Sequence, residues 1–130
     1  MWIFTRYGFF SISVQGKHVA VRARSVEHLE RLLERFWPRK KPAITVLEDA
    51  DYRYRITTPK TTWANVAFDL AMEQTWSNFK DEAERFARSK YDEVLEPNDE
   101  MYVHALHEVW GIMFQLQHQL TAGAHGAQKA

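Results

Sequence analysis

The sequence predicts an α+β fold: an antiparallel sheet of three to five strands, opening with an N-terminal meander, packed against about four helices, of which the C-terminal one is long. Residues 9–24 alternate in polarity with the two-residue period of half-buried strands. Apolar side chains recur at helical spacing over residues 26–37 and 102–120. Most strand-like segments precede most helical ones, which is typical of α+β proteins.

Three strands are expected at the N-terminus. Residues 2–5 form a short strand, residues 9–15 and 18–24 form two longer ones, and Gly16-Lys17 is the tip of the hairpin between them. The side chains expected in the core are Phe10, Ile12, Val14, Val19, Val21 and Ala23. The opposite face is expected to carry Phe9, Ser11, Ser13, Ala20, Arg22 and Arg24.

A first helix and two further strands follow. Ser25 is the expected N-cap of a helix over residues 26–37, which Pro38 terminates. Residues 44–47 form a short strand. Residues 52–56 form another, because Tyr and Ile alternate there with two arginines.

Three more helices complete the predicted fold. Thr58 caps the second, with Pro59 at its first position; Ser77 or Asn78 caps the third; and Pro97 opens the fourth. The apolar stripe of the second helix comprises Trp63, Val66, Ala67 and Leu70. That of the third comprises Phe79, Ala83, Phe86 and Tyr91, and that of the fourth Tyr102, Leu106, Val109, Met113, Leu116 and Leu120.

Length and composition indicate one domain. A chain of 130 residues can bury a hydrophobic core, so we expect a single domain over residues 1–121 and a flexible tail over residues 122–130, which hold no large apolar side chain. The absence of cysteine excludes a disulfide framework and a cysteine nucleophile. Arg6 and Ser11 interrupt the N-terminal apolar cluster, which therefore fits neither a signal peptide nor a membrane span. We expect a cytoplasmic protein that does not bind membranes.

The net charge is zero, but the charge is unevenly distributed along the chain. Residues 1–60 carry 12 Lys/Arg and 6 Asp/Glu, whereas residues 61–130 carry 5 and 11. Such asymmetry can steer a charged partner or favour association between copies of the chain. The alternative is that both halves simply have solvated surfaces.

One candidate binding surface is basic. If the strands of residues 18–24 and 52–56 share a sheet, arginines and a phenylalanine lie on its open face, with three cations at one end. The set comprises Arg22, Arg24, Arg53, Arg55 and Phe9, with Arg39, Lys40 and Lys41 at the end. Cations and rings on a sheet can hold single-stranded nucleic acid. The alternative is a solvated face whose arginines pair with nearby acids.

A second candidate surface lies on the last helix. Glu100, His104, His107, Gly111 and His118 fall on one side, opposite the apolar face, with Phe114 at the edge. Histidines three residues apart can bind a zinc-class ion, but no further ligand is indicated, so no metal site is predicted. A solvated face and a helix–helix interface are the alternatives. Glycine in mid-helix favours the interface, because it costs about 1 kcal/mol relative to alanine.

A third feature is acidic. Its members are Asp81, Glu82, Glu84, Asp92, Glu93, Glu96, Asp99 and Glu100. Such a surface can imitate a nucleic-acid backbone, although several of these acids can form ordinary helix pairs with Arg85 and Arg88. The chain contains no glycine-rich phosphate loop, no Gly-x-Ser-x-Gly and no repeated acidic metal spacing, so no enzymatic activity and no cofactor are expected.

Several short motifs resemble a known family. In order these are MWIFT and GFFS, VRAR leading into HLERLL, DYRYRI before a helix containing Trp63, and WSNFK. Their succession over residues 1–110 resembles a largely uncharacterised family of small bacterial and phage-borne proteins. Where that family has Asp-Tyr-x-Asn-Phe-Lys, this chain has Thr75-Trp76 in place of the acidic-aromatic pair and keeps Asn78, Phe79 and Lys80. The resemblance implies a compact domain encoded on mobile elements and no catalytic residues.

These observations favour a small non-catalytic protein-interaction module. With the resemblance, they suggest a phage or mobile-element accessory factor that inhibits or adapts a host defence complex. A homo-oligomer fits the same observations. The alternative is a single-stranded nucleic-acid binder that uses the arginine-lined sheet face, and a metal site at His104 and His107 ranks third.

Overall fold

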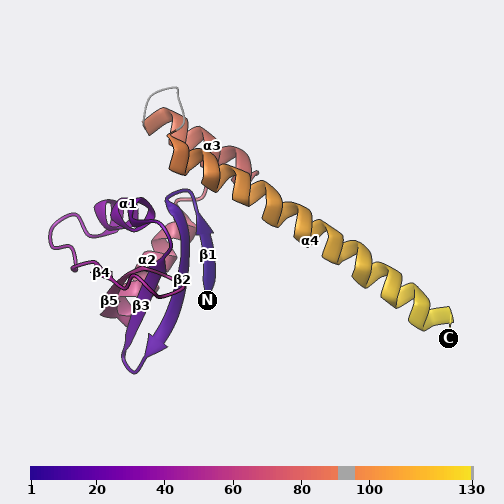
Figure 1. Cartoon of the computed structure of the whole chain (residues 1–130), viewed down its shortest axis with the longest axis horizontal. Coiled ribbons are helices and arrows are strands. Elements are labelled where there is room, and N and C mark those ends of the chain that lie inside the picture. The colour runs from indigo at the N-terminus through magenta and orange to yellow at the C-terminus, as the bar shows by residue number, and fades with distance from the viewer. Residues whose placement is uncertain (91–95, 130) are drawn as a thin grey trace. The chain divides into compact units, whose positions relative to one another are not determined.

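The computed structural model describes residues 1–90 and 96–129 (Figure 1). Its internal contacts group the chain into two compact units, Met1–Ser77 and Asn78–Ala130. The first unit contains the sheet and two helices, and the second contains two further helices. The α+β class and the long C-terminal helix are confirmed, whereas the single domain over residues 1–121 stays a prediction. The two units are described in turn.

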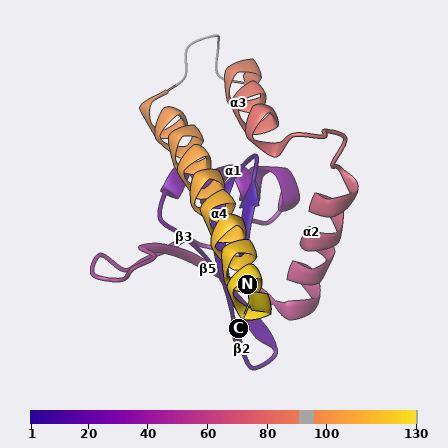
Figure 2. The same ribbon diagram turned by 90° about the vertical axis from the view of Figure 1, so that its right-hand side faces the viewer.

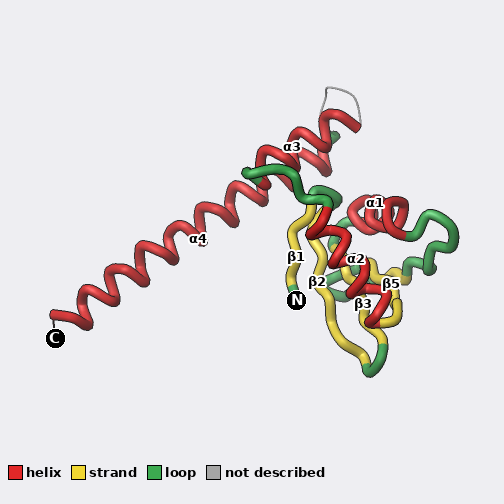
Figure 3. The backbone as a smooth tube through the Cα atoms, turned by 180° about the vertical axis from the view of Figure 1, so that it is seen from behind, coloured by secondary structure: helices red, strands yellow, loops and turns green. Residues whose placement is uncertain are grey.

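The first unit is built on a five-stranded antiparallel sheet, drawn in yellow in Figure 3. The strands are β1 (Trp2–Thr5), β2 (Gly8–Gln15), β3 (His18–Ala23), β4 (Thr45–Val46) and β5 (Tyr54–Pro59). Their order across the sheet is β1-β2-β3-β5-β4, so the predicted meander is confirmed and β5 is inserted beside β3. Both edge strands are short.

Two tight turns connect the meander. The β2–β3 hairpin turns at Gly16, whose φ is 63°, and Gln15 pairs with His18 across it. The β1–β2 turn is held by the Thr5 hydroxyl, which accepts hydrogen bonds from the amides of Tyr7 and Gly8 at 3.1 Å each and donates to the Gly8 carbonyl at 2.8 Å. The hairpin tip predicted at Gly16 is therefore confirmed.

The helices of this unit are α1 (Val26–Phe36) and α2 (Lys60–Met72). Ser25 is the N-cap residue of α1, as predicted, but its hydroxyl donates to the Glu27 carboxylate at 2.8 Å and makes no capping bond to the backbone. The predicted cap of α2 is wrong, because β5 continues to Pro59. Thr58 is buried in that strand, where it pairs with Val19.

The core lies between one face of the sheet and the buried stripes of α1 and α2, both of which contact β3 and β5. Its side chains from the sheet include Phe10, Ile12, Val19, Val21, Ala23 and Ile56. The helices contribute Leu29, Leu32, Leu33, Trp63 and Val66. Val14 was predicted to be buried and is exposed, because it lies beside the hairpin tip at Gly16.

The second unit consists of α3 (Phe79–Lys90) and α4 (Pro97–Lys129), which contact each other. Asn78 caps α3, as predicted, because its side-chain oxygen accepts the Asp81 amide at 3.2 Å. The predicted stripe residue Tyr91 lies outside the described residues. The α4 ribbon is continuous to Lys129 (Figure 2), so residues 122–129 are helical where the sequence predicts a tail. Their alanines are strong helix formers. The flexibility of this segment stays a prediction.

Candidate functional site

The strand register decides the geometry of the arginine surface. Strands β3 and β5 are neighbours, and Arg22 pairs directly with Arg55. Arg22 also pairs with Ser11 on β2, so these three residues lie on one face of the sheet, opposite the core. The sequence could only state this arrangement conditionally, because it does not specify which strands are adjacent.

The three arginines nearest this face make hydrogen bonds within the chain. Arg22 donates to the Ser11 hydroxyl at 2.7 Å. Arg24 donates to the Asp51 carbonyl at 3.4 Å, and Arg55 donates to the Tyr52 carbonyl at 3.3 Å. The last two bonds hold the segment that leads into β5. These guanidinium groups therefore serve the fold.

Tyr52 lies on this face, where the sequence predicts the opposite. Its ring lies 4.8 Å from the Arg22 guanidinium and 4.3 Å from that of Arg24, and 6.4 Å from the Phe9 ring. Alternation over residues 52–56 predicts Tyr52 on the same side of the strand as Ile56, but β5 begins only at Tyr54, so strand geometry does not orient Tyr52. Its buried ring covers part of the sheet that we expected to be open.

Phe9 is half-buried within an aromatic cluster at the β1 edge. Its ring stacks on Phe4 at 4.6 Å and meets Trp2 edge-on at 5.9 Å. Trp2 is 71% exposed and is the most accessible ring of the group. A nucleic-acid base can stack only on an exposed ring, and here that ring is Trp2 rather than Phe9. The sequence analysis did not single out Trp2.

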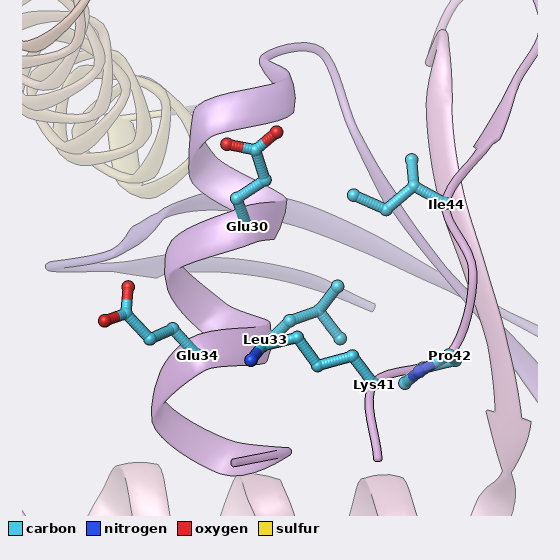
Figure 4. A pocket seen from close by; sticks show the side chains of 6 residues that line it. All are labelled: Glu30, Leu33, Glu34, Lys41, Pro42 and Ile44. Carbon is cyan, nitrogen blue, oxygen red and sulfur yellow. The ribbon is translucent and has the colours of Figure 1, made fainter. Parts of the chain in front are cut away.

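The basic loop lies beside α1. Lys41 lines a shallow pocket of about 390 Å³ with Glu30, Leu33, Glu34, Pro42 and Ile44. Figure 4 shows the Lys41 side chain extending toward α1. Arg39, Lys40 and Arg53 are exposed, and Arg53 accepts the Leu47 amide at its carbonyl at 2.7 Å. Lys41 therefore lines the same pocket as two glutamates of α1.

The sequence does not predict a partly buried polar cluster in the first unit. Glu73, at the end of α2, accepts the Tyr7 hydroxyl at 2.8 Å and forms ion pairs with Arg6 at 3.5 Å and Arg35 at 3.3 Å. The Glu73 side chain is only 12% exposed, and the Arg6 guanidinium lies 5.2 Å from the Trp76 ring. Three segments distant in sequence meet here, so no local motif could reveal the cluster.

Burial raises the pKa of the Tyr7 phenol above its ordinary value of 10.0; Glu73 adds to the rise and Arg6 opposes it. A pKa raised on folding stabilises the fold below the unfolded pKa, and that contribution is lost as pH rises through the folded pKa. We therefore expect the free energy of unfolding to fall at alkaline pH, and Tyr7→Phe to remove part of that fall. Urea unfolding of both proteins from about pH 8 to 11 measures it. Parallel curves would contradict the prediction.

Two acidic residues of α3 pair with arginines of the same helix. Glu82 is buried and accepts two hydrogen bonds from Arg85, at 2.7 and 2.6 Å. Glu84 pairs with Arg88 at 3.0 Å. These are the helix pairs expected from their spacing. Asp92 and Glu93 lie outside the described residues, so a continuous acidic surface stays a prediction.

The histidine face of α4 is exposed at Glu100, His104, His107 and His118. The His104 imidazole lies 3.5 Å from the Glu108 carboxylate, and the His118 ring meets Phe114 edge-on at 4.6 Å. Within the part of the chain that the structure describes, no three His, Cys, Asp or Glu side chains are grouped as metal ligands. A Cβ atom on Gly111 would meet nothing within 4 Å, so packing inside the chain does not require this glycine.

Gly111→Ala should stabilise the protein by about 0.5–1 kcal/mol, because alanine loses less backbone entropy in a helix and has free space here. Chemical denaturation followed by circular dichroism measures the change. A loss of stability would contradict this prediction. It would mean that glycine is needed at position 111 for a reason other than space for a side chain.

The C-terminal half of α4 exposes large apolar side chains. They are Trp110, Ile112, Met113, Phe114, Leu116 and Leu120, called here the α4 apolar surface. Trp110 stacks on Phe114 at 5.2 Å, and Lys80 of α3 lies 4.5 Å from the Trp110 ring. None of the helices described is both long and apolar enough to cross a membrane. The apolar stripe predicted from the sequence includes three of these residues, Met113, Leu116 and Leu120.

Comparison with family models, curated proteins and solved structures found no match to this chain. The resemblance to small bacterial and phage-borne proteins therefore stays a prediction. The arguments for the candidate surfaces depend only on the contacts and exposure of their residues.

Proposed function

We propose that this chain is a non-catalytic protein-interaction module whose binding surface is the α4 apolar surface. The single observation that carries the proposal is the exposure of six large apolar side chains within eleven residues of one helix. Contiguous exposed apolar patches on proteins commonly mark interaction sites. Trp110 adds to this support, because tryptophan is enriched among the residues that dominate binding energy.

The nucleic-acid alternative has less support. Arg22, Arg24 and Arg55 are engaged by carbonyls, by a hydroxyl and by the Tyr52 ring, so binding phosphate would compete with contacts that hold the β5 segment. Exposed Trp2 is the feature that favours this alternative. We propose two further properties that the α4 apolar surface does not itself indicate: a role in inhibiting or adapting a host defence complex, and a cytoplasmic location. The role in host defence depends on the family resemblance.

The proposal is tested by affinity capture from a lysate of the source organism with three versions of the chain. Met113→Glu/Leu116→Glu places two charges on the α4 apolar surface. His107→Glu/Gln115→Glu adds the same number of carboxylates at exposed positions outside the α4 apolar surface and is the matched control. We expect the same protein to be captured by wild type and control and lost with the first variant. Equal capture by all three would refute the proposal.

A further inference from the structure

The apolar stripe of α4 has the spacing of a coiled-coil seam. Its members are Tyr102, Leu106, Val109, Met113, Leu116 and Leu120, called here the seam. Successive members are separated by four, three, four, three and four residues, which is the a/d pattern of heptads. A helix with this repeat buries its seam against another helix of the same kind.

Only the first part of the seam is covered. Leu106 is 4% exposed, and Tyr102 and Val109 are half-buried. By contrast Met113 is 56% exposed and Leu120 is 65% exposed. The α4 helix continues past them to Lys129, so a straight apolar ridge is available to a further helix over residues 109–120.

The positions that flank the seam carry no charge. They are Val103, Ala105, Trp110, Ile112, Gln117 and Gln119. In coiled coils these e and g positions usually hold charged residues that select the partner. A strongly charged partner would therefore find no complementary groups along this ridge, whereas a second copy of the same helix brings an equally uncharged ridge.

Charge is also separated along the helix axis, which sets the orientation of such a pair. Residues 96–108 contain four acidic residues, whereas residues 109–130 contain no Asp or Glu and include Lys129. An antiparallel second copy places the acidic end of each helix beside the non-acidic end of the other. A parallel copy would place the two acidic ends together.

We infer that the chain forms a homodimer through antiparallel pairing of its α4 helices. Met113 of each copy lies opposite Leu116 of the other, and Val109 lies opposite Leu120, so that a positions pack against d positions. This inference rests on the proposed function and deepens it: the partner of the interaction module is a second copy of the chain.

The test is the mass of the full chain in solution. We expect light scattering after size exclusion to give a dimer at about 100 µM, a concentration at which a dimer of micromolar affinity is associated. Met113→Glu/Leu116→Glu should be monomeric, with the dissociation constant raised at least about 100-fold by carboxylates left unpaired in the interface. His107→Glu/Gln115→Glu should remain dimeric. Both variants should unfold cooperatively in urea, because the substituted positions are exposed.

The orientation is tested by cysteines, because the chain has none of its own. A mixture of Met113→Cys and Leu116→Cys proteins should form the mixed disulfide in preference to either homodimer. A dominant Met113→Cys homodimer would indicate parallel pairing and overturn the antiparallel arrangement.

The failures of the two proposals are distinguishable. A monomeric wild type that captures another protein through the α4 apolar surface overturns the homodimer and leaves the proposed function standing. A dimer that persists in Met113→Glu/Leu116→Glu uses another surface, and also overturns the inference. A monomer that captures nothing refutes both.

Discussion

Gly8→Ala should destabilise the protein by about 3 kcal/mol or more, the largest effect we expect from a single methyl group in this chain. Gly8 has a φ of 150°, a conformation that L side chains rarely adopt. A Cβ atom there would also overlap the Cβ and Cγ atoms of His28, which is buried under the β1–β2 turn. Backbone strain and overpacking each cost about 1–3 kcal/mol. Urea denaturation measures the change.

Two controls separate these causes. Gly16→Ala shares a positive φ, 63°, but its Cβ meets nothing within 4 Å, so it should cost only about 1–2 kcal/mol. If the overlap dominates at Gly8, adding His28→Gly, which removes both overlapping atoms, to Gly8→Ala should cost less than the sum of the two single changes. Additive costs of Gly8→Ala and His28→Gly would rule out the overlap as the cause, and so would equal costs of Gly8→Ala and Gly16→Ala. His28 also accepts the Phe9 amide at 3.3 Å, so His28→Gly alone is destabilising.

Glu73→Ala is expected to cost about 2–3 kcal/mol. The buried Tyr7 hydroxyl would lose its acceptor, and Arg6 and Arg35 would lose their shared carboxylate. An unsatisfied buried hydroxyl costs about 1–3 kcal/mol, and the ion pairs add less than a fully buried pair would, because Arg35 is half-exposed. Denaturant unfolding at neutral pH gives the value.

Matched variants sharpen the Glu73 prediction. Asp69→Ala removes an exposed carboxylate from the same helix and should change stability by less than about 0.5 kcal/mol. Glu73→Gln keeps an acceptor for Tyr7 and should cost less than Glu73→Ala. A double-mutant cycle with Tyr7→Phe should show a coupling energy between the two side chains. Zero coupling would mean that the 2.8 Å contact does not contribute to stability.

The sequence predicted those parts of the fold that are governed by local pattern. Alternation assigned Phe10 and Val21 to the core correctly, because each side chain of a central strand faces either the helices or the opposite side. It failed at Tyr52, which precedes β5 and is oriented by two arginines instead. Alternation also failed to predict that Val14 is exposed. It specifies the face of the sheet on which a side chain lies, and not whether a helix covers that part of the face.

The candidate sites were predicted less completely. Arg22 and Arg55 are neighbours because β5 pairs with β3. No local sequence signal indicates that these two strands are adjacent. The Glu73 cluster joins Tyr7 to a residue 66 positions away. The spacing of apolar residues predicted the stripe of α4, but spacing alone could not show that Met113 and Leu120 are exposed.

The insertion of β5 beside β3 has a consequence for folding kinetics. Strands β1 to β3 are joined by two tight turns, so their pairing closes only short loops and costs little chain entropy. Pairing of β3 with β5 closes a much longer loop, which contains α1 and β4. This pairing places buried Val21 beside buried Ile56. Non-local pairing of this kind is slow. We therefore expect the meander to form early and the docking of β5 to limit the folding rate of the first unit.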